Sequence, residues 1–334
     1  MRKQRGLTAE QVRYITDHKE LHELIKREDL FFGVRNEYFN LYYRCASVGK
    51  FTSLKGDSPC VETDKKYLGA GSKLMDLKTF RERYESILEG IVRVQGKGCR
   101  EKIAQQALVL ANNRNMDSKW YCVDLEYVQQ REDGSESQFG RFDIVAVSKA
   151  AGKEGRHRVA LIELKVGYKT CYFSDFPEWI QKQIDGQLFS IYDYKGSLGS
   201  GIVGHLADFC RFEQSGQFEK LRAEVCTILS NKRALGFDVP CPELCPQDLE
   251  EQPHFYFLTL SRDDSSESIA SCKNSMYHYL GIKGHGGLAA YHAKRALGDT
   301  FLERENYHFL FAPGGMCGRE TLDILGEPDI EWLK

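Results

Sequence analysis

The sequence predicts a mixed α/β fold of the α+β kind, in which a helix, three strands, a second helix and a further strand follow one another. Three observations predict it. Residues 158–166 form a nearly continuous apolar run, as expected of a strand covered on both faces. Apolar residues recur at helical spacing in residues 99–112 and 177–194, on either side of the strands. Polar connections at residues 131–137 and 150–157 separate the strand-like runs.

The first predicted helix, residues 99–112, brings an acidic side chain near the sheet. Its apolar residues form one stripe, namely Ile103, Ala107, Leu110 and Ala111. Glu101 lies on another face, which it shares with Ala104 and Leu108, so its carboxylate can point inward from the first turn. The alternative is a carboxylate that is favoured only because it lies near a helix N-terminus.

Three strands are predicted next, at residues 119–130, 140–147 and 158–166. Side chains alternate faces along a strand, so Glu163 and Lys165 project on one side, with Leu164 and Val166 on the other. The second strand can fold back on the third through a polar turn, which places Asp143 beside Glu163 at a strand spacing of about 5 Å. Two carboxylates at that separation repel each other unless a cation lies between them.

A divalent cation would satisfy this pair of carboxylates. Mg²⁺ prefers oxygen ligands and is typically held by one or two carboxylates together with waters and substrate phosphate. Asp143 and Glu163 can supply the carboxylates, with the carbonyl of Leu164 as a third ligand. Lys165 can orient the attacking water or stabilise charge on the phosphate. The cluster predicts metal-dependent phosphodiester hydrolysis; the alternative is a solvated Glu163–Lys165 pair on an edge strand, which stabilises little.

The pattern D-x19-E-x-K on consecutive strands resembles the PD-(D/E)xK nuclease superfamily. Phe142-Asp143 stands where the family name has Pro-Asp, and Glu163-Leu164-Lys165 is the intact second half. The resemblance covers roughly residues 96–262. It implies a restriction-endonuclease-like core of αβββαβ order, Mg²⁺ as cofactor with Mn²⁺ as a substitute, and Glu101 as an accessory acidic residue at the metal.

The helix predicted after these strands, residues 177–194, carries two glutamines. Gln187 lies on its apolar stripe and Gln183 one turn earlier, and a glutamine on an apolar face needs a hydrogen-bonding partner. The family resemblance implies that Gln187 contacts the catalytic lysine or the substrate backbone, and Gln183, Lys169 and Lys182 are the candidates for substrate binding. Otherwise the glutamines are rim residues that bond the backbone.

The chain divides by pattern into residues 1–95, 96–262 and 263–334. The first part has helical spacing in residues 8–26, a strand-like meander in residues 29–54 and a helical connection in residues 74–94. The meander is rich in aromatic residues, which either stack on nucleobases or form the core of a sheet: Phe31, Phe32, Tyr38, Phe39, Tyr42 and Tyr43.

Further elements are predicted in the C-terminal half. Residues 218–235 have the pattern of an amphipathic helix, and residues 254–260 that of the last core strand. A glycine-rich loop is expected within residues 281–298. A strand at residues 307–312 either extends the main sheet or pairs elsewhere.

Composition narrows the classes of protein and partner. The chain has 334 residues, and no apolar run approaches the length of a membrane span, so we expect a cytoplasmic protein without membrane contact. Eleven scattered cysteines, an odd number, argue against a disulfide framework, and Cys241 and Cys245 lack the second pair of a zinc site. The net charge of −2 is mild evidence against an extended footprint on nucleic acid.

Basic residues could still be segregated along one groove. The candidates either line such a groove or are ordinary solvated side chains: Lys153, Arg156 and Arg158 near the strand turn, and Arg222, Lys232 and Arg233 further on.

The functional expectation is a Mg²⁺-dependent endonuclease whose partner is nucleic acid, most simply DNA, acting in defence against foreign DNA or in repair. A homodimer would suit duplex cleavage, because one site cuts one strand. Two alternatives stay open: a non-catalytic nucleic-acid-binding or assembly protein that retains the nuclease fold, and a nuclease that acts on RNA.

Overall fold

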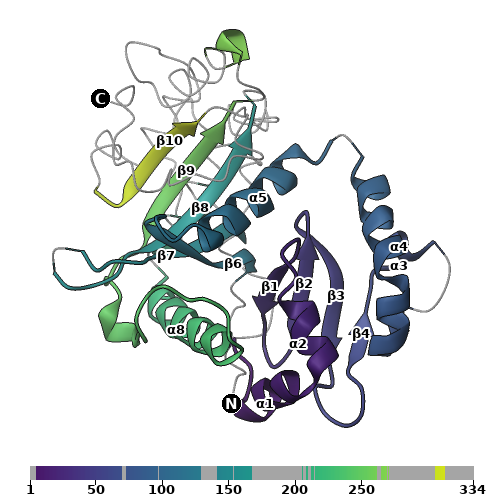
Figure 1. The fold of residues 1–334 in the computed structure, drawn as a ribbon. Coiled ribbons are helices and arrows are strands. Elements are labelled where there is room, and N and C mark those ends of the chain that lie inside the picture. The colour runs from purple at the N-terminus through teal and green to yellow at the C-terminus, as the bar shows by residue number, and fades with distance from the viewer. Residues whose placement is uncertain are drawn as a thin grey trace, which may run out of the picture.

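The described residues form a mixed α+β fold with two five-stranded sheets (Figure 1). The computed structural model describes residues 5–69, 73–96, 98–128, 141–152, 154–167, 215–261 and 305–312, with short pieces at 205, 208–209, 212–213, 265–268 and 270. Among the helices of these ranges, none is both long enough and apolar enough to cross a membrane.

The chain opens with two short helices where one was predicted over residues 8–26: α1, Ala9–Asp17, and α2, Lys19–Ile25. Thr8 starts α1 with a capping box, in which its hydroxyl accepts from the Gln11 amide at 3.2 Å. The backbone leaves helical geometry at His18, with φ −88° and ψ 89°. A continuous helix was therefore wrong, although the apolar spacing on each side of the break is correct.

The first sheet is an antiparallel meander with the strand order β1-β2-β3-β4-β5. Its strands are β1, Phe31–Val34; β2, Phe39–Tyr43; β3, Ala46–Thr52; β4, Cys60–Glu62; and β5, Leu74–Met75. Of its aromatic side chains, Phe31, Phe32, Phe39 and Tyr42 are buried, so the sheet-core alternative for them is correct.

Two helices accompany the first sheet: α3, Lys65–Leu68, and α4, Leu77–Gln95. Helix α4 starts later than the predicted residue 74, because residues 74–75 pair with β4. Asp76 then caps the helix by accepting from the Thr79 amide at 2.7 Å.

The second sheet has the order β10-β9-β8-β7-β6 and contains the predicted strands. Strands β6, β7 and β8 are antiparallel neighbours, whereas β9 is parallel to β8 and β10 is parallel to β9. The bounds are β6, Trp120–Val128; β7, Arg141–Ser148; β8, Val159–Val166; β9, His254–Leu260; and β10, Tyr307–Ala312. The strand at residues 307–312 thus extends the main sheet, and β8 is its central strand.

Two helices cover opposite faces of the second sheet (Figure 1). Helix α5, Arg100–Arg114, packs with the side chains of Ile144 and Ile162. Helix α8, Phe218–Ala234, packs in the cluster that contains Val145 and Leu161, and the short helix η2, Pro246–Asp248, follows it. Strand β8 is therefore covered on both faces, as its continuous apolar run indicated.

The buried face of α5 differs from the predicted stripe. Ile103, Ala107, Leu110 and Ala111 are only half-buried, whereas Ala104, Leu108 and Val109 are buried. Three amide side chains are buried with them, at Gln105, Gln106 and Asn112, and each donates to a backbone carbonyl. The stripe was wrong because glutamines with buried partners occupy positions that a hydropathy pattern assigns to the surface.

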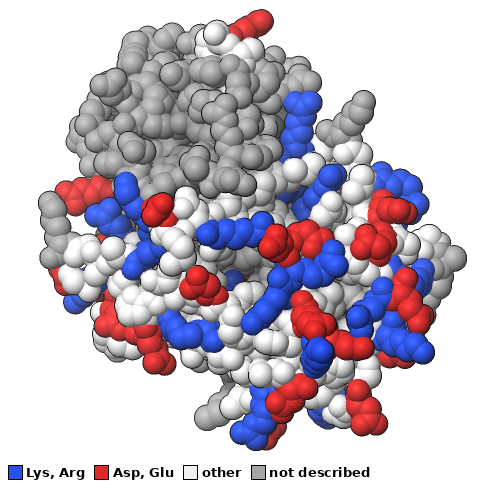
Figure 2. Space-filling view, in the orientation of Figure 1, with Lys and Arg blue, Asp and Glu red and all other residues white. Residues whose placement is uncertain are grey.

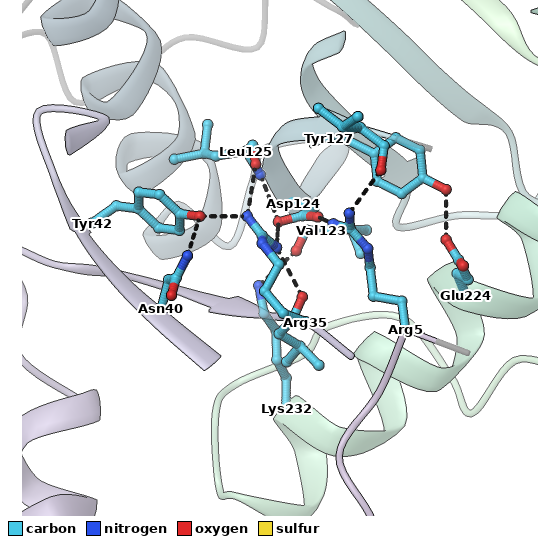
Figure 3. Close-up of polar contacts among 12 residues, drawn as sticks. Arg5, Arg35, Asn40, Tyr42, Val123, Asp124, Leu125, Tyr127, Glu224 and Lys232 are labelled. Carbon is cyan, nitrogen blue, oxygen red and sulfur yellow. Dashed lines mark hydrogen bonds and ion pairs between the residues drawn. The ribbon is translucent and has the colours of Figure 1, made fainter. Parts of the chain in front are cut away.

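The N-terminal segment and the second sheet share one hydrophobic cluster, which includes Leu7, Val34, Val145 and Val225. Buried ion pairs also join them. Asp124 on β6 accepts from the guanidinium groups of Arg5 and Arg35, the latter at 2.7 Å (Figure 3). The first 95 residues are therefore packed against the sheet that follows them.

Candidate active site

Strands β7 and β8 separate where Asp143 and Glu163 lie. Their ladder ends at the pair Ile144↔Ile162, and the next step of this register sets Asp143 opposite Glu163. At that position the Asp143 Oδ2 atom accepts the Leu164 amide proton at 2.9 Å. A carboxylate thus replaces a backbone acceptor at the end of the ladder. The antiparallel hairpin brings the two acids together, as the strand pattern predicted.

Glu163 and Lys165 lie on one face of β8 and form a buried pair. Their side chains are only 2% and 7% exposed, and Lys165 Nζ lies 2.5 Å from Glu163 Oε1. The same ammonium lies 3.3 Å from the carbonyl oxygen of Leu164. Because β8 is the central strand of the described sheet, the alternative of a solvated pair on an edge strand is wrong.

Helix α5 contributes to the site from its N-terminal half. Glu101, in the first turn, places Oε1 3.4 Å from Lys165 Nζ, and its side chain is 35% exposed. Gln105, one turn later, donates to the carbonyl oxygen of Asp143 at 2.5 Å. The inward direction predicted for Glu101 is confirmed, and Gln105 ties the helix to the end of β7.

The pKa values of the ionisable groups in the cluster shift in different directions. Burial, and then the charge of Glu163, raise the pKa of Asp143 well above its ordinary value. Burial also acts to raise the pKa of Glu163, but His205 and Lys165 outweigh it, so that pKa is lowered. For Lys165, burial acts to lower the pKa, and the surrounding carboxylates reverse this and raise it. Without a metal, the stable arrangement is therefore an ionised Glu163–Lys165 pair beside an Asp143 that holds a proton readily.

Sequence reasoning missed His205. Its Nε2 atom lies 3.0 Å from Glu163 Oε1, and its ring lies 6.3 Å from that of Phe257. A lone histidine in a glycine-containing stretch carries no spacing signal, so only the folded chain places it. Gln105 was missed because it lies off the predicted apolar stripe, where a hydropathy pattern assigns a polar side chain to the surface.

The oxygen atoms of Asp143, Glu163 and Leu164 could supply some of the ligands of a hard divalent cation. Glu163 Oε2 is buried and has no hydrogen-bond partner among the described residues, which is costly for a carboxylate oxygen. Asp143 lies opposite Glu163 in the β7–β8 register, and the Leu164 carbonyl oxygen lies 3.3 Å from Lys165 Nζ. In the part of the chain that the structure describes, no group of three or more His, Cys, Asp or Glu side chains forms a ready metal cage. Two carboxylates and a carbonyl suit Mg²⁺, which keeps several waters and takes further oxygens from substrate.

Several predicted residues lie outside the described ranges. These are Gln183, Gln187, Lys169 and Lys182, together with the helix predicted over residues 177–194, the loop at 281–298 and Lys153.

The described basic residues that were candidates for a groove, apart from Lys232, are bonded to acidic side chains or to backbone carbonyls. Arg156 and Arg158 pair with Glu251 and Glu250, at 2.9 and 3.2 Å. Arg233 donates to the Cys241 and Pro242 carbonyls. Arg222 pairs with Glu219, and Lys232 is buried. On the face that Figure 2 shows, Lys and Arg are interspersed with Asp and Glu over the described residues.

Comparison with protein-family models, with curated proteins and with solved structures finds no match to this chain. The site geometry is therefore the observation on which a functional proposal rests.

Proposed function

We propose that the protein is a Mg²⁺-dependent nuclease of the PD-(D/E)xK type that hydrolyses phosphodiester bonds, with DNA as the substrate. The observation that carries this proposal is the convergence of Asp143, Glu163 and Lys165 in one buried cluster, where Glu163 Oε2 has no partner within the described part of the chain. The order of α5, β6, β7 and β8, with β9 parallel to β8, agrees with a restriction-endonuclease-like core.

The proposed roles follow from the contacts. Asp143 and Glu163, with the carbonyl of Leu164, would hold the metal, which when bound supplies an activated water and offsets charge on the phosphate. Engagement of Glu163 Oε2 leaves Oε1 bonded to Lys165, so the ammonium stays fixed at the site. From there Lys165 orients the attacking water and stabilises the developing negative charge. Gln105 keeps the Asp143 backbone in place.

A cleavage assay tests the proposal directly. Purified protein is incubated with plasmid, linear and single-stranded DNA and with RNA, in Mg²⁺, Mn²⁺ or EDTA. We expect cleavage of DNA with either metal and none in EDTA; cleavage that persists in EDTA would remove the mechanism. Cleavage of RNA alone would move the substrate to RNA. Intact nucleic acid under every condition would instead support a non-catalytic binding or assembly protein.

Cleavage is expected to fall as the pH is lowered. Metal ligands must be deprotonated, and burial raises the pKa of Asp143 well above its ordinary value, so protons compete with the metal at that carboxylate. The activity should therefore rise with pH through the folded-state pKa of Asp143 and then level off. The measurement is kcat/KM against pH at several Mg²⁺ concentrations. A higher Mg²⁺ concentration should move the midpoint of the pH profile to lower pH. A midpoint that does not change with Mg²⁺ concentration would contradict competition between protons and metal at Asp143.

A Glu101→Gln variant is expected to lose about tenfold in cleavage rate, which corresponds to about 1.4 kcal/mol. Glu101 is half-exposed and meets the site only through Lys165, at 3.4 Å, so its loss shifts the ammonium without removing a central ligand. A single-turnover assay measures the effect. Glu89→Gln, on the preceding helix α4, is the matched control and should keep the parental rate. A loss as large as that of a central ligand would make Glu101 a direct metal ligand.

A further inference from the structure

A cavity lies where α2, β1, α5, β6 and α8 meet, and none of the candidate active-site residues lines it. Its volume is about 330 Å³. Aromatic rings supply much of its wall, from Phe31, Phe32, Tyr121 and Phe237. The Phe32 and Phe237 rings stack with their centroids 5.2 Å apart. A space of this size is at the small end of ligand pockets, so it suits one small molecule and excludes a nucleic-acid chain.

A buried lysine forms part of this wall. Lys232 of α8 is 2% exposed and donates one hydrogen bond, to the Val123 carbonyl at 2.8 Å (Figure 3). Its Nζ atom lies 4.4 Å from the ring centroid of Phe31 and 5.6 Å from that of Tyr121. Among the described residues no carboxylate lies within ion-pair distance of it. An ammonium has three N–H donors, and for two of them the described residues supply no acceptor.

The neighbouring charges do not compensate Lys232. Asp124 is the nearby buried acid, and it is already held by Arg5 and Arg35 (Figure 3). Three buried cations thus lie around one buried carboxylate. A buried charge without a partner is costly, and an anion that entered the cavity would relieve that cost.

Further basic groups lie along the cavity. Lys26, Arg27 and Arg114 line it together with the acidic side chains of Glu28 and Asp238, and Arg27 is paired with Asp29 at 3.0 Å. Cations therefore outnumber acids in the wall, even though the protein as a whole carries a net charge of −2. The basic residues of the wall attract anions, and the aromatic rings of the same wall offer flat apolar surfaces.

We propose that this cavity is a binding site for a small anion that carries a flat ring, with the Lys232 ammonium as its counter-charge and the Phe31, Tyr121 and Phe237 rings as its apolar walls. A nucleoside monophosphate and an aromatic carboxylate share this chemistry, and the test separates these two sources.

Isothermal titration calorimetry on the full chain tests the proposal. The probes are AMP, GMP, CMP and UMP for one source, and benzoate and 4-hydroxybenzoate for the other. Adenosine supplies a ring without the anion, and inorganic phosphate supplies the anion without a ring. We expect saturable binding of at least one probe from the first two groups, and at least tenfold weaker binding of adenosine and phosphate. Equal binding of inorganic phosphate would indicate an adventitious anion and would overturn the proposal, as would binding by no probe.

Lys232→Met is the decisive variant, because it keeps the length of the side chain and removes its charge. We expect at least a tenfold loss of affinity, as a lost charge-assisted hydrogen bond implies. Lys220→Met, the same change earlier on α8, is the matched control and should bind as the parent does. If Lys232→Met binds the probes as tightly as the parent does, the proposal is wrong.

Stability and a second variant keep this test interpretable. Removing an unpaired buried charge should leave the free protein at least as stable, which thermal unfolding measures. Should Lys232→Met fail to fold, Phe237→Ala removes a ring from the half-buried rim, and it should weaken the ring-bearing probe at least threefold. Affinity unchanged in Phe237→Ala would equally count against the site.

Discussion

An Asp143→Asn variant is expected to lose the proposed Mg²⁺-dependent cleavage by about 1,000-fold or more, which corresponds to about 4 kcal/mol of transition-state stabilisation. Asparagine matches aspartate in shape, and its side-chain oxygen can still accept the Leu164 amide that Asp143 Oδ2 accepts at 2.9 Å. The substitution therefore removes the negative charge and retains the end of the β7–β8 ladder. Single-turnover cleavage of a labelled duplex, together with calorimetric titration of Mn²⁺, measures both losses.

Stability distinguishes this loss from simple unfolding. Because burial raises the pKa of Asp143 in the folded state above its unfolded value, its favourable contribution is present at low pH and is lost as the pH rises through the folded-state pKa. Asparagine cannot ionise, so without metal the variant should be at least as stable as the parent at pH 8. Near pH 4 the two should be equal. Asp57→Asn, an exposed loop change, should alter neither cleavage nor stability. A variant that cleaves normally would remove Asp143 from the mechanism.

The central cluster could be predicted from the sequence because short-range rules determine it. Alternation along a strand places Glu163 and Lys165 on one face, and a hairpin with a polar turn sets Asp143 opposite Glu163. The continuous apolar run in β8 indicated a strand covered on both faces, and burial on both faces follows from the packing of α5 and α8.

Residues whose roles depend on distant partners could not be found in this way. Gln105 is buried because the Asp143 carbonyl accepts from it, and His205 approaches Glu163 from a segment about 40 residues further along the chain. Lys232 resembles any surface lysine at the end of an amphipathic helix. Only the packing of α8 against β6 and β1 shows that it is buried between aromatic rings. The hydropathy pattern of the sequence specifies helices and strands. Which buried polar groups find hydrogen-bond partners depends on how those helices and strands pack together.

An Asp124→Asn variant is expected to lower the free energy of unfolding by about 3–5 kcal/mol, the usual cost of removing one partner from a buried ion pair. Asp124 is 1% exposed and accepts from both Arg5 and Arg35, which come from the N-terminal segment (Figure 3). Its loss leaves those guanidinium groups buried without an opposite charge. Urea unfolding at pH 7 measures the change. Asp117→Asn, in the exposed turn before β6, should change stability by less than about 0.5 kcal/mol.

The same loss should be smaller when Lys232 is also removed. Burial lowers the pKa of Lys232 to about 8, with Asp124 opposing the shift and Arg35 adding to it, so at pH 7 the amine is mostly charged and adds to the repulsion among the buried cations. In a Lys232→Met background, Asp124→Asn leaves one buried cation fewer, and the double-mutant cycle should show a coupling of about 1 kcal/mol. That coupling should shrink as the pH is raised above 8, because the lysine then loses its charge in the folded state. Additive changes at pH 7 would mean that Lys232 and Asp124 do not share one electrostatic network.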